Sequence, residues 1–186
     1  MSTKVNPILT VADLDLMPDD DKRYELFEGE IFVARAPALS HQRVLANLVT
    51  ILESFLRESA VGKIWPTPGV VFDDLNAAIP DIAFVRSERL GVIASGDKIT
   101  GAPDLIVEIL SAGSADQRRD RIIKRQVYSK FRVSEYWIVD RFERLVEIYR
   151  LDEAQLVLVA TLNEGDVVSS IVLPGLNREV RQVFNE

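Results

Sequence analysis

The most informative segment of the sequence is Leu105-Ile106-Val107-Glu108-Ile109-Leu110. An almost continuous apolar run of this length is typical of a strand that a sheet buries on both faces. Glu108 breaks the run, and burying a carboxylate without partners costs on the order of several kcal/mol. Its side chain must therefore be protonated, paired with a cation or bound to a metal ion. Pairing with an arginine is the simplest structural explanation, and metal binding is the functional alternative.

A second acid, Asp81, follows Pro80 and starts an apolar strand that runs to Val85. Proline fits the first residue of a strand, where no backbone donor is needed. Taken alone, Asp81 is equally consistent with a turn at the strand end. If it lay beside Glu108, the two carboxylates would repel each other unless a cation lay between them. Oxygen ligands favour Mg²⁺ or Mn²⁺ over Zn²⁺.

The other periodic segments predict an α/β domain with a mixed sheet. Tyr24 to Val33 indicates a hairpin with a turn near Glu28-Gly29, and Thr10-Val-Ala-Asp13 resembles a capping box that opens a short helix. Ser40 is expected to cap a long amphipathic helix that reaches about Arg57. Further strands are expected at residues 63–65, 70–72, 81–85, 105–110, 136–139, 145–149 and 155–160, with a loop at 87–101, a basic helix at 115–131 and an extended segment at 167–172.

The basic helix supplies a third candidate, Lys124. Asp120, Lys124 and Tyr128 are spaced four residues apart and lie on or beside the inward apolar stripe of the helix. An inward lysine can simply extend its ammonium to the surface. The functional alternative places the ammonium beside the metal carboxylates, where it could align the attacking water and stabilise charge on a phosphate. A more exposed face of the helix carries Arg118, Arg121 and Arg125.

Composition is that of an ordinary globular protein, with 47% hydrophobic and 27% charged residues and a net charge of -7. Residues 118–132 carry +6, which leaves -13 on the rest of the chain, so a local basic strip could still dock a phosphate backbone. The chain has no cysteine, no signal-peptide pattern at its start and no apolar run of membrane-spanning length. We therefore expect a cytoplasmic protein with no membrane association.

Three further residues are weaker candidates. The single histidine, His41, falls on the apolar face of its helix and is more often an interior residue than a ligand, although helix N-termini do bind phosphates. Glu25 is either a solvated strand residue or a third carboxylate, and Ser111 could bond to Glu108. No P-loop, Gly-x-Gly-x-x-Gly or Gly-x-Ser-x-Gly pattern is present.

Five ordered motifs carry a family resemblance over most of the chain, from about Thr10 to Phe184. They resemble the Uma-two family of putative restriction endonucleases, within the PD-(D/E)xK nuclease superfamily. Each motif is weak alone, but the ordered set is fairly specific. The motifs are Tyr24-Glu-Leu-Phe-Glu-Gly-Glu30, Ser40-His41-Gln42, Ile79-Pro80-Asp81, Gly101-Ala-Pro-Asp-Leu-Ile-Val-Glu-Ile-Leu-Ser111 and Glu135-Tyr-Trp-Ile-Val-Asp140.

The resemblance implies a single restriction endonuclease-like domain over residues 1–186, with a central mixed β-sheet flanked by helices and the active site at one sheet edge. Asp81 matches the first acid of the motif and Glu108 the second. Leu110 stands where a lysine is usual, which departs from the pattern. Related nucleases supply this lysine from the following helix, where Lys124 stands. Lys124 to Tyr128 also resembles a Gln-x-x-x-Tyr element of exonuclease-like relatives.

The expected function is therefore Mg²⁺- or Mn²⁺-dependent hydrolysis of DNA phosphodiesters, by a homodimer. Asp81, Glu108 and the carbonyl of Ile109 would hold the metal, Lys124 would align the nucleophile, and Arg118, Arg121 and Arg125 would grip the DNA backbone. One alternative is a non-catalytic module on a nuclease fold, which binds DNA or a protein but never cuts. Another is a carboxylate-pair hydrolase of a small substrate, whose activity would resist EDTA.

Overall fold

The structure, a computed structural model, describes residues 7–18, 20, 22–34 and 36–185. Its largest sheet is mixed, because β8 and β9 are parallel while the other neighbours are antiparallel. This six-stranded sheet contains, in spatial order, β11 (Gln155–Asn163), β10 (Leu145–Asp152), β9 (Glu135–Asp140), β8 (Leu105–Ile109), β6 (Ile82–Arg86) and β3 (Gly62–Pro66).

A second sheet, of five strands, carries the predicted hairpin at one edge. Its order is β2 (Glu30–Ala34), β1 (Arg23–Phe27), β5 (Asn76–Ala78), β4 (Val70–Asp73) and β7 (Ile99–Thr100). Two short strands, β12 (Val167–Val168) and β13 (Arg178–Glu179), pair separately. The expected mixed sheet is therefore present, accompanied by a second sheet that the sequence patterns did not separate from it.

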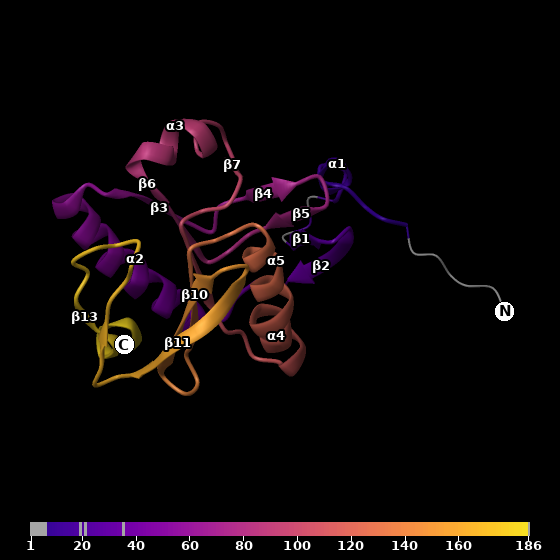
Figure 1. Cartoon of the computed structure of the whole chain (residues 1–186). Coiled ribbons are helices and arrows are strands. Elements are labelled where there is room, and N and C mark those ends of the chain that lie inside the picture. The colour runs from indigo at the N-terminus through magenta and orange to yellow at the C-terminus, as the bar shows by residue number, and fades with distance from the viewer. Residues whose placement is uncertain (1–6, 19, 21, 35, 186) are drawn as a thin grey trace.

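The helices are α1 (Val11–Leu14), α2 (Leu39–Ser59), α3 (Leu90–Ile93), α4 (Ser114–Arg118) and α5 (Arg125–Lys130), with a π-helical turn, η2 (Arg119–Lys124), between the last two. Two 3₁₀ turns cover Ser87–Arg89 and Val180–Phe184. In Figure 1, α2 and the α4–α5 pair lie to either side of β10. No helix in the described part of the chain combines the length and apolar content needed to cross a bilayer.

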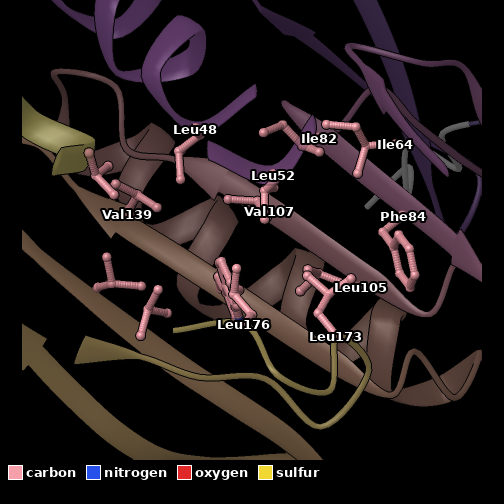
Figure 2. Packing of buried hydrophobic residues seen from close by; sticks show 14 of the residues in the cluster. Leu48, Leu52, Ile64, Ile82, Phe84, Leu105, Val107, Val139, Leu173 and Leu176 are labelled. Atoms are coloured by element: carbon pink, nitrogen blue, oxygen red, sulfur yellow. The ribbon is translucent and has the colours of Figure 1, made fainter. Parts of the chain in front are cut away.

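Alternating residues of β8 serve two different cores. Leu105, Val107 and Ile109 pack in the cluster that contains Leu48 and Leu52 of α2, and Figure 2 shows Leu52 directly beside Val107. Ile106 and Leu110 instead pack with Val127 and Tyr128 of α5. Because successive side chains of a strand point to opposite faces, Glu108 shares the α5 face. This placement explains how an acid can interrupt a buried strand, since the α5 side supplies its polar partners.

The register of the six-stranded sheet brings the two predicted acids together. β6 and β8 are antiparallel, and Ile82 pairs with Val107. One step further along, Asp81 stands opposite Glu108, on neighbouring strands that lie about 4.8 Å apart. Ile82 and Val107 both pack in the cluster that contains Leu48 and Leu52 of α2. Because successive side chains of a strand alternate between faces, Asp81, which precedes Ile82, and Glu108, which follows Val107, both face the α5 side.

The predicted helix at 115–131 is helical over Ser114–Lys130, but its middle is a π-helical turn. Such a turn is wider than an α-helical turn and occurs often at functional sites. Asp120, Lys124 and Tyr128 are all buried. Because the wider turn advances less per residue around the axis, the four-residue spacing keeps these three side chains on one face.

Several local predictions can be compared directly with the structure. The capping box of Thr10 and Asp13 is present, and the hairpin turn at Glu28-Gly29 is confirmed. The prediction that Ser40 caps the long helix is wrong, since Ala38 is the N-cap and the Ser40 hydroxyl accepts a hydrogen bond from Arg141 Nη1 at 2.6 Å. The prediction of a loop at 87–101 is also incomplete, because this segment contains a 3₁₀ turn, α3 and β7.

Candidate active site

A small cavity of about 50 Å³ lies between the first hairpin, the adjoining ends of β6 and β8, and η2. We call it the acidic cavity, because four buried carboxylic acids line it: Glu25, Asp81, Glu108 and Asp120. It has room for an ion and a small number of water molecules. The remaining lining residues are Arg23, Ala34, Pro37, His41, Ile79, Ile109, Ser111, Arg119 and Lys124.

Lys124 is the central cation of the acidic cavity and is only 3% exposed. Its Nζ lies 2.9 Å from Glu108 Oε1, 3.0 Å from Glu25 Oε1 and 3.6 Å from Asp120 Oδ1. Burial alone would lower the pKa of this ammonium, but the surrounding carboxylates outweigh burial and raise the pKa above its ordinary value. Lys124 therefore stays protonated.

Glu108 receives a second hydrogen bond at the same oxygen. The hydroxyl of Tyr128 donates to Glu108 Oε1 at 2.8 Å, beside the bond from Lys124. Burial raises the pKa of Glu108 well above its ordinary value, although the Lys124 ammonium opposes this shift. Both donors occupy Oε1, which leaves Oε2 as the oxygen available to a cation.

Asp81 is held from two sides. Its Oδ2 accepts a hydrogen bond from the backbone N–H of Ile109 at 2.7 Å, which ties the start of β6 to the end of β8. The same oxygen lies 3.2 Å from Nε2 of His41, while Nδ1 of this histidine is buried with no hydrogen-bond partner in the described structure. The histidine is therefore an interior residue, as one interpretation of the sequence expected, and it also lines the acidic cavity.

Glu25 reaches the acidic cavity from β1. Its Oε1 accepts a hydrogen bond from the N–H of Ile79 at 3.0 Å, and its Oε2 lies 3.9 Å from Nε of Arg119. This acid thus links β1 to the segment between β5 and β6 and to η2. Glu25 is buried, so the interpretation of this residue as a solvated strand residue is wrong.

Sequence reasoning did not identify Asp120 or Arg119 as site residues. Asp120 Oδ1 and Arg119 Nε are buried without a hydrogen-bond partner among the described residues, 3.9 Å apart. Burial raises the pKa of Asp120 to about 6, and Lys124 and Arg119 partly counteract this shift. The four-residue spacing from Asp120 to Lys124 was the available signal, since it puts both on one helix face.

The predicted phosphate-binding arginines lie elsewhere. Arg118 is exposed, Arg121 pairs with Glu147 and with Asp140 at 3.2 Å, and the Arg125 guanidinium stands 5.4 Å from the centre of the Tyr149 ring. None of the three lines the acidic cavity as the described residues define it. Their contact with DNA stays a prediction. Ser111 does line the cavity, but it makes no hydrogen bond to Glu108 within the described structure.

The acidic cavity suits a hard divalent cation that keeps much of its water. In the part of the chain that the structure describes, no three His, Cys, Asp or Glu side chains are placed to hold a metal ion by themselves. Mg²⁺ commonly uses one or two carboxylates and takes its other ligands from water and substrate phosphates. The opposed positions of Asp81 and Glu108, and an Asp120 Oδ1 that accepts no hydrogen bond in the described structure, are compatible with such a cation.

The fold, a mixed sheet flanked by helices, is restriction endonuclease-like. Residues 11–181 match the Uma2 family, described as "Putative restriction endonuclease", and the chain belongs to this family.

Solved structures support the same fold. The chain is similar to a putative nuclease belonging to DUF820 from Anabaena variabilis ATCC 29413, with a TM-score of 0.78 and 19% identity over 95% of this chain and 97% of that chain. It is weakly similar to the type IIG restriction endonuclease BpuSI, with a TM-score of 0.44 and 11% identity over 77% of this chain and 15% of that chain, a likeness too low to support an argument. No curated protein matches the chain significantly.

Proposed function

We propose that this protein is a divalent-metal-dependent endonuclease that hydrolyses phosphodiester bonds of DNA. The observation that carries the proposal is the position of Asp81 and Glu108 one step beyond the Ile82–Val107 pair of adjacent strands, with the buried ammonium of Lys124 2.9 Å from Glu108. The family match supports a nuclease, and DNA is the substrate that a restriction endonuclease family implies.

Asp81 and Glu108, together with the carbonyl of Ile109, would hold Mg²⁺ or Mn²⁺. The bound ion would supply a water of lowered pKa and polarise the phosphate. The hydrogen bonds at Asp81 Oδ2 and Glu108 Oε1 orient these carboxylates, and the other oxygen of each would be the one to bind the cation. These bonds cost little at the moment of reaction, because they are already formed in the folded protein.

Lys124 serves as a fixed positive charge and hydrogen-bond donor. Its raised pKa excludes it as a general base near neutral pH, because Nζ has no lone pair to offer while it is protonated. Asp120 suits the proton-accepting role better, since its pKa of about 6 lies close to the working range and its Oδ1 accepts no hydrogen bond from the described residues. We therefore assign acceptance of the water proton to Asp120 Oδ1.

The experiment is cleavage of supercoiled plasmid DNA with Mg²⁺ or Mn²⁺, and with EDTA as the metal-free control. We expect nicking by the wild type that is lost in Asp81→Asn and Glu108→Gln. Asp152→Asn, at the exposed end of β10, is the matched control and should cut normally. Light scattering in the same buffers tests the expected homodimer, which remains a prediction.

One observation favours a second candidate, a non-catalytic module that binds DNA or a protein. Lys124 already contacts Glu25 and Glu108 at hydrogen-bonding distance, so the protein offsets part of the charge of these acids without a metal. This candidate predicts a folded protein that never cuts, even with Mn²⁺. The carboxylate-pair hydrolase predicts EDTA-resistant turnover instead, and the 50 Å³ cavity offers little room for a sugar substrate.

A further inference from the structure

A larger groove, of about 660 Å³, flanks the first two turns of α2. We call it the arginine groove, because three of its lining residues are Arg43, Arg141 and Arg144. None of the described residues that line it is acidic. The others are Leu39, Ser40, Gln42, Val44, Ala46, Phe184 and Asn185.

The arginine groove and the acidic cavity meet along two segments of the chain. Along α2, His41 lines the acidic cavity while Ser40 and Gln42 line the groove. At the end of β8, Ile109 and Ser111 line the cavity, and the residue between them, Leu110, accepts a hydrogen bond from Arg141 Nε at 3.1 Å. The groove is therefore next to the candidate catalytic acids.

The positive charge of the groove is not cancelled by its own contacts. Arg141 hydrogen-bonds to a backbone carbonyl and to the Ser40 hydroxyl, both neutral. Arg43 is exposed and makes no ion pair with any described residue. Arg144 differs, since it pairs with Glu164. Arg43 and Arg141 thus leave net positive charge on an otherwise acidic protein, at a helix end whose first turn has no acidic residue.

One of the groove's arginines also contacts an exposed aromatic ring. The Arg141 guanidinium lies 4.1 Å from the centre of the Phe142 ring, and this ring is 47% exposed. Aromatic faces and arginines together are features that nucleic-acid surfaces use for bases and phosphates.

We propose that the arginine groove binds the backbone phosphates of duplex DNA that flank the bond presented to the acidic cavity. This inference rests on the proposed function for its substrate, but binding can be measured without cleavage. Arg43 contacts a phosphate directly. Arg141, fixed by Leu110 and Ser40, holds the neighbouring phosphate in register with the catalytic acids.

The test is fluorescence anisotropy of a labelled short duplex with full-length protein in EDTA, over a series of salt concentrations. Arg43→Gln should weaken binding roughly fivefold to tenfold at low salt and reduce the slope of log affinity against log salt by about 0.9, the loss of one phosphate contact. Arg57→Gln is the control, because it is exposed on the same helix about 21 Å further along and outside the groove. It should bind like the wild type.

Equal binding by the two variants at every salt concentration would overturn the proposal. Competition by poly-glutamate would also overturn it, if Arg43→Gln weakened the binding of poly-glutamate as much as the binding of DNA. The groove would then be a general polyanion site. The nuclease proposal is tested separately by plasmid cleavage with Mn²⁺. If Arg43→Gln alone lost DNA binding and the wild type cleaved no DNA, the proposal for the arginine groove would stand and the nuclease proposal would be refuted.

Discussion

Replacing Lys124 with methionine should reduce the free energy of unfolding by about 3–5 kcal/mol near pH 8, and by less near pH 5. Methionine keeps most of the length of the side chain but removes the charge. The variant leaves Glu25 and Glu108 without the ammonium that now lies 3.0 Å and 2.9 Å from them. The magnitude is the usual cost of breaking a buried ion pair by removing one partner.

The dependence on pH follows from the direction of the Glu108 shift. Its pKa in the folded protein is already above the ordinary 4.5, and loss of Lys124 removes the ammonium that holds it down. Above pH 4.5 the unfolded chain releases this proton while the folded variant retains it, so stability falls as pH rises. The wild type shares part of this loss, because its own Glu108 pKa is raised, so the deficit of the variant grows as the pH rises above the pKa of Glu108 in the folded wild type.

The assay is urea unfolding of both proteins at the two pH values. Lys130→Met is the control, since Lys130 belongs to the same helix but pairs with Glu28 at the surface, with side chains 51% and 59% exposed. An exposed pair of this kind contributes about 0–1 kcal/mol. If Lys124→Met lost no more stability than Lys130→Met, or lost the same amount at both pH values, the buried charge network would be refuted.

Three further substitutions probe the acidic cavity. Glu108→Gln should reduce plasmid cleavage by at least about 100-fold while circular dichroism shows an intact fold, and near-normal cleavage would remove this acid from the site. The Asp120 pKa rises from 3.8 to about 6 on folding, so the free energy of unfolding of the wild type falls as pH increases through that window. Asp120→Asn should lack this fall when urea unfolding is measured across the same pH range. Parallel curves of stability against pH for the two proteins would contradict the shift. Tyr128→Phe leaves Glu108 Oε1 with one donor fewer and should cost about 1–3 kcal/mol, measured by thermal unfolding, and an unchanged stability would argue against the hydrogen bond.

Periodicity predicted most of the elements that position the acidic cavity. The apolar run around Glu108 is the buried strand β8, and the four-residue spacing of Asp120, Lys124 and Tyr128 is the inward helix face. These features are local, because a strand alternates and a helix repeats over a few residues. An acid within an apolar run also needs a partner, which made Glu108 conspicuous.

Long-range features could not be predicted in the same way. Glu25 reaches Lys124 only because the hairpin at residues 23–34 folds against η2, and no local pattern specifies that contact. The π-helical turn has no sequence signature in this chain, and no local pattern distinguishes Arg119, which lines the acidic cavity, from the other arginines of its helix. β5 spans only Asn76–Ala78, too short for alternation to be recognised. Ser40 resembles a helix cap but turns to Arg141 instead.

The most direct measurement is an anomalous difference map from crystals soaked in Mn²⁺. We expect a peak between the carboxylates of Asp81 and Glu108, close to Lys124, that disappears in crystals of Glu108→Gln. A well-ordered acidic cavity with no anomalous peak at saturating Mn²⁺, or a peak that persists unchanged in the variant, would contradict it.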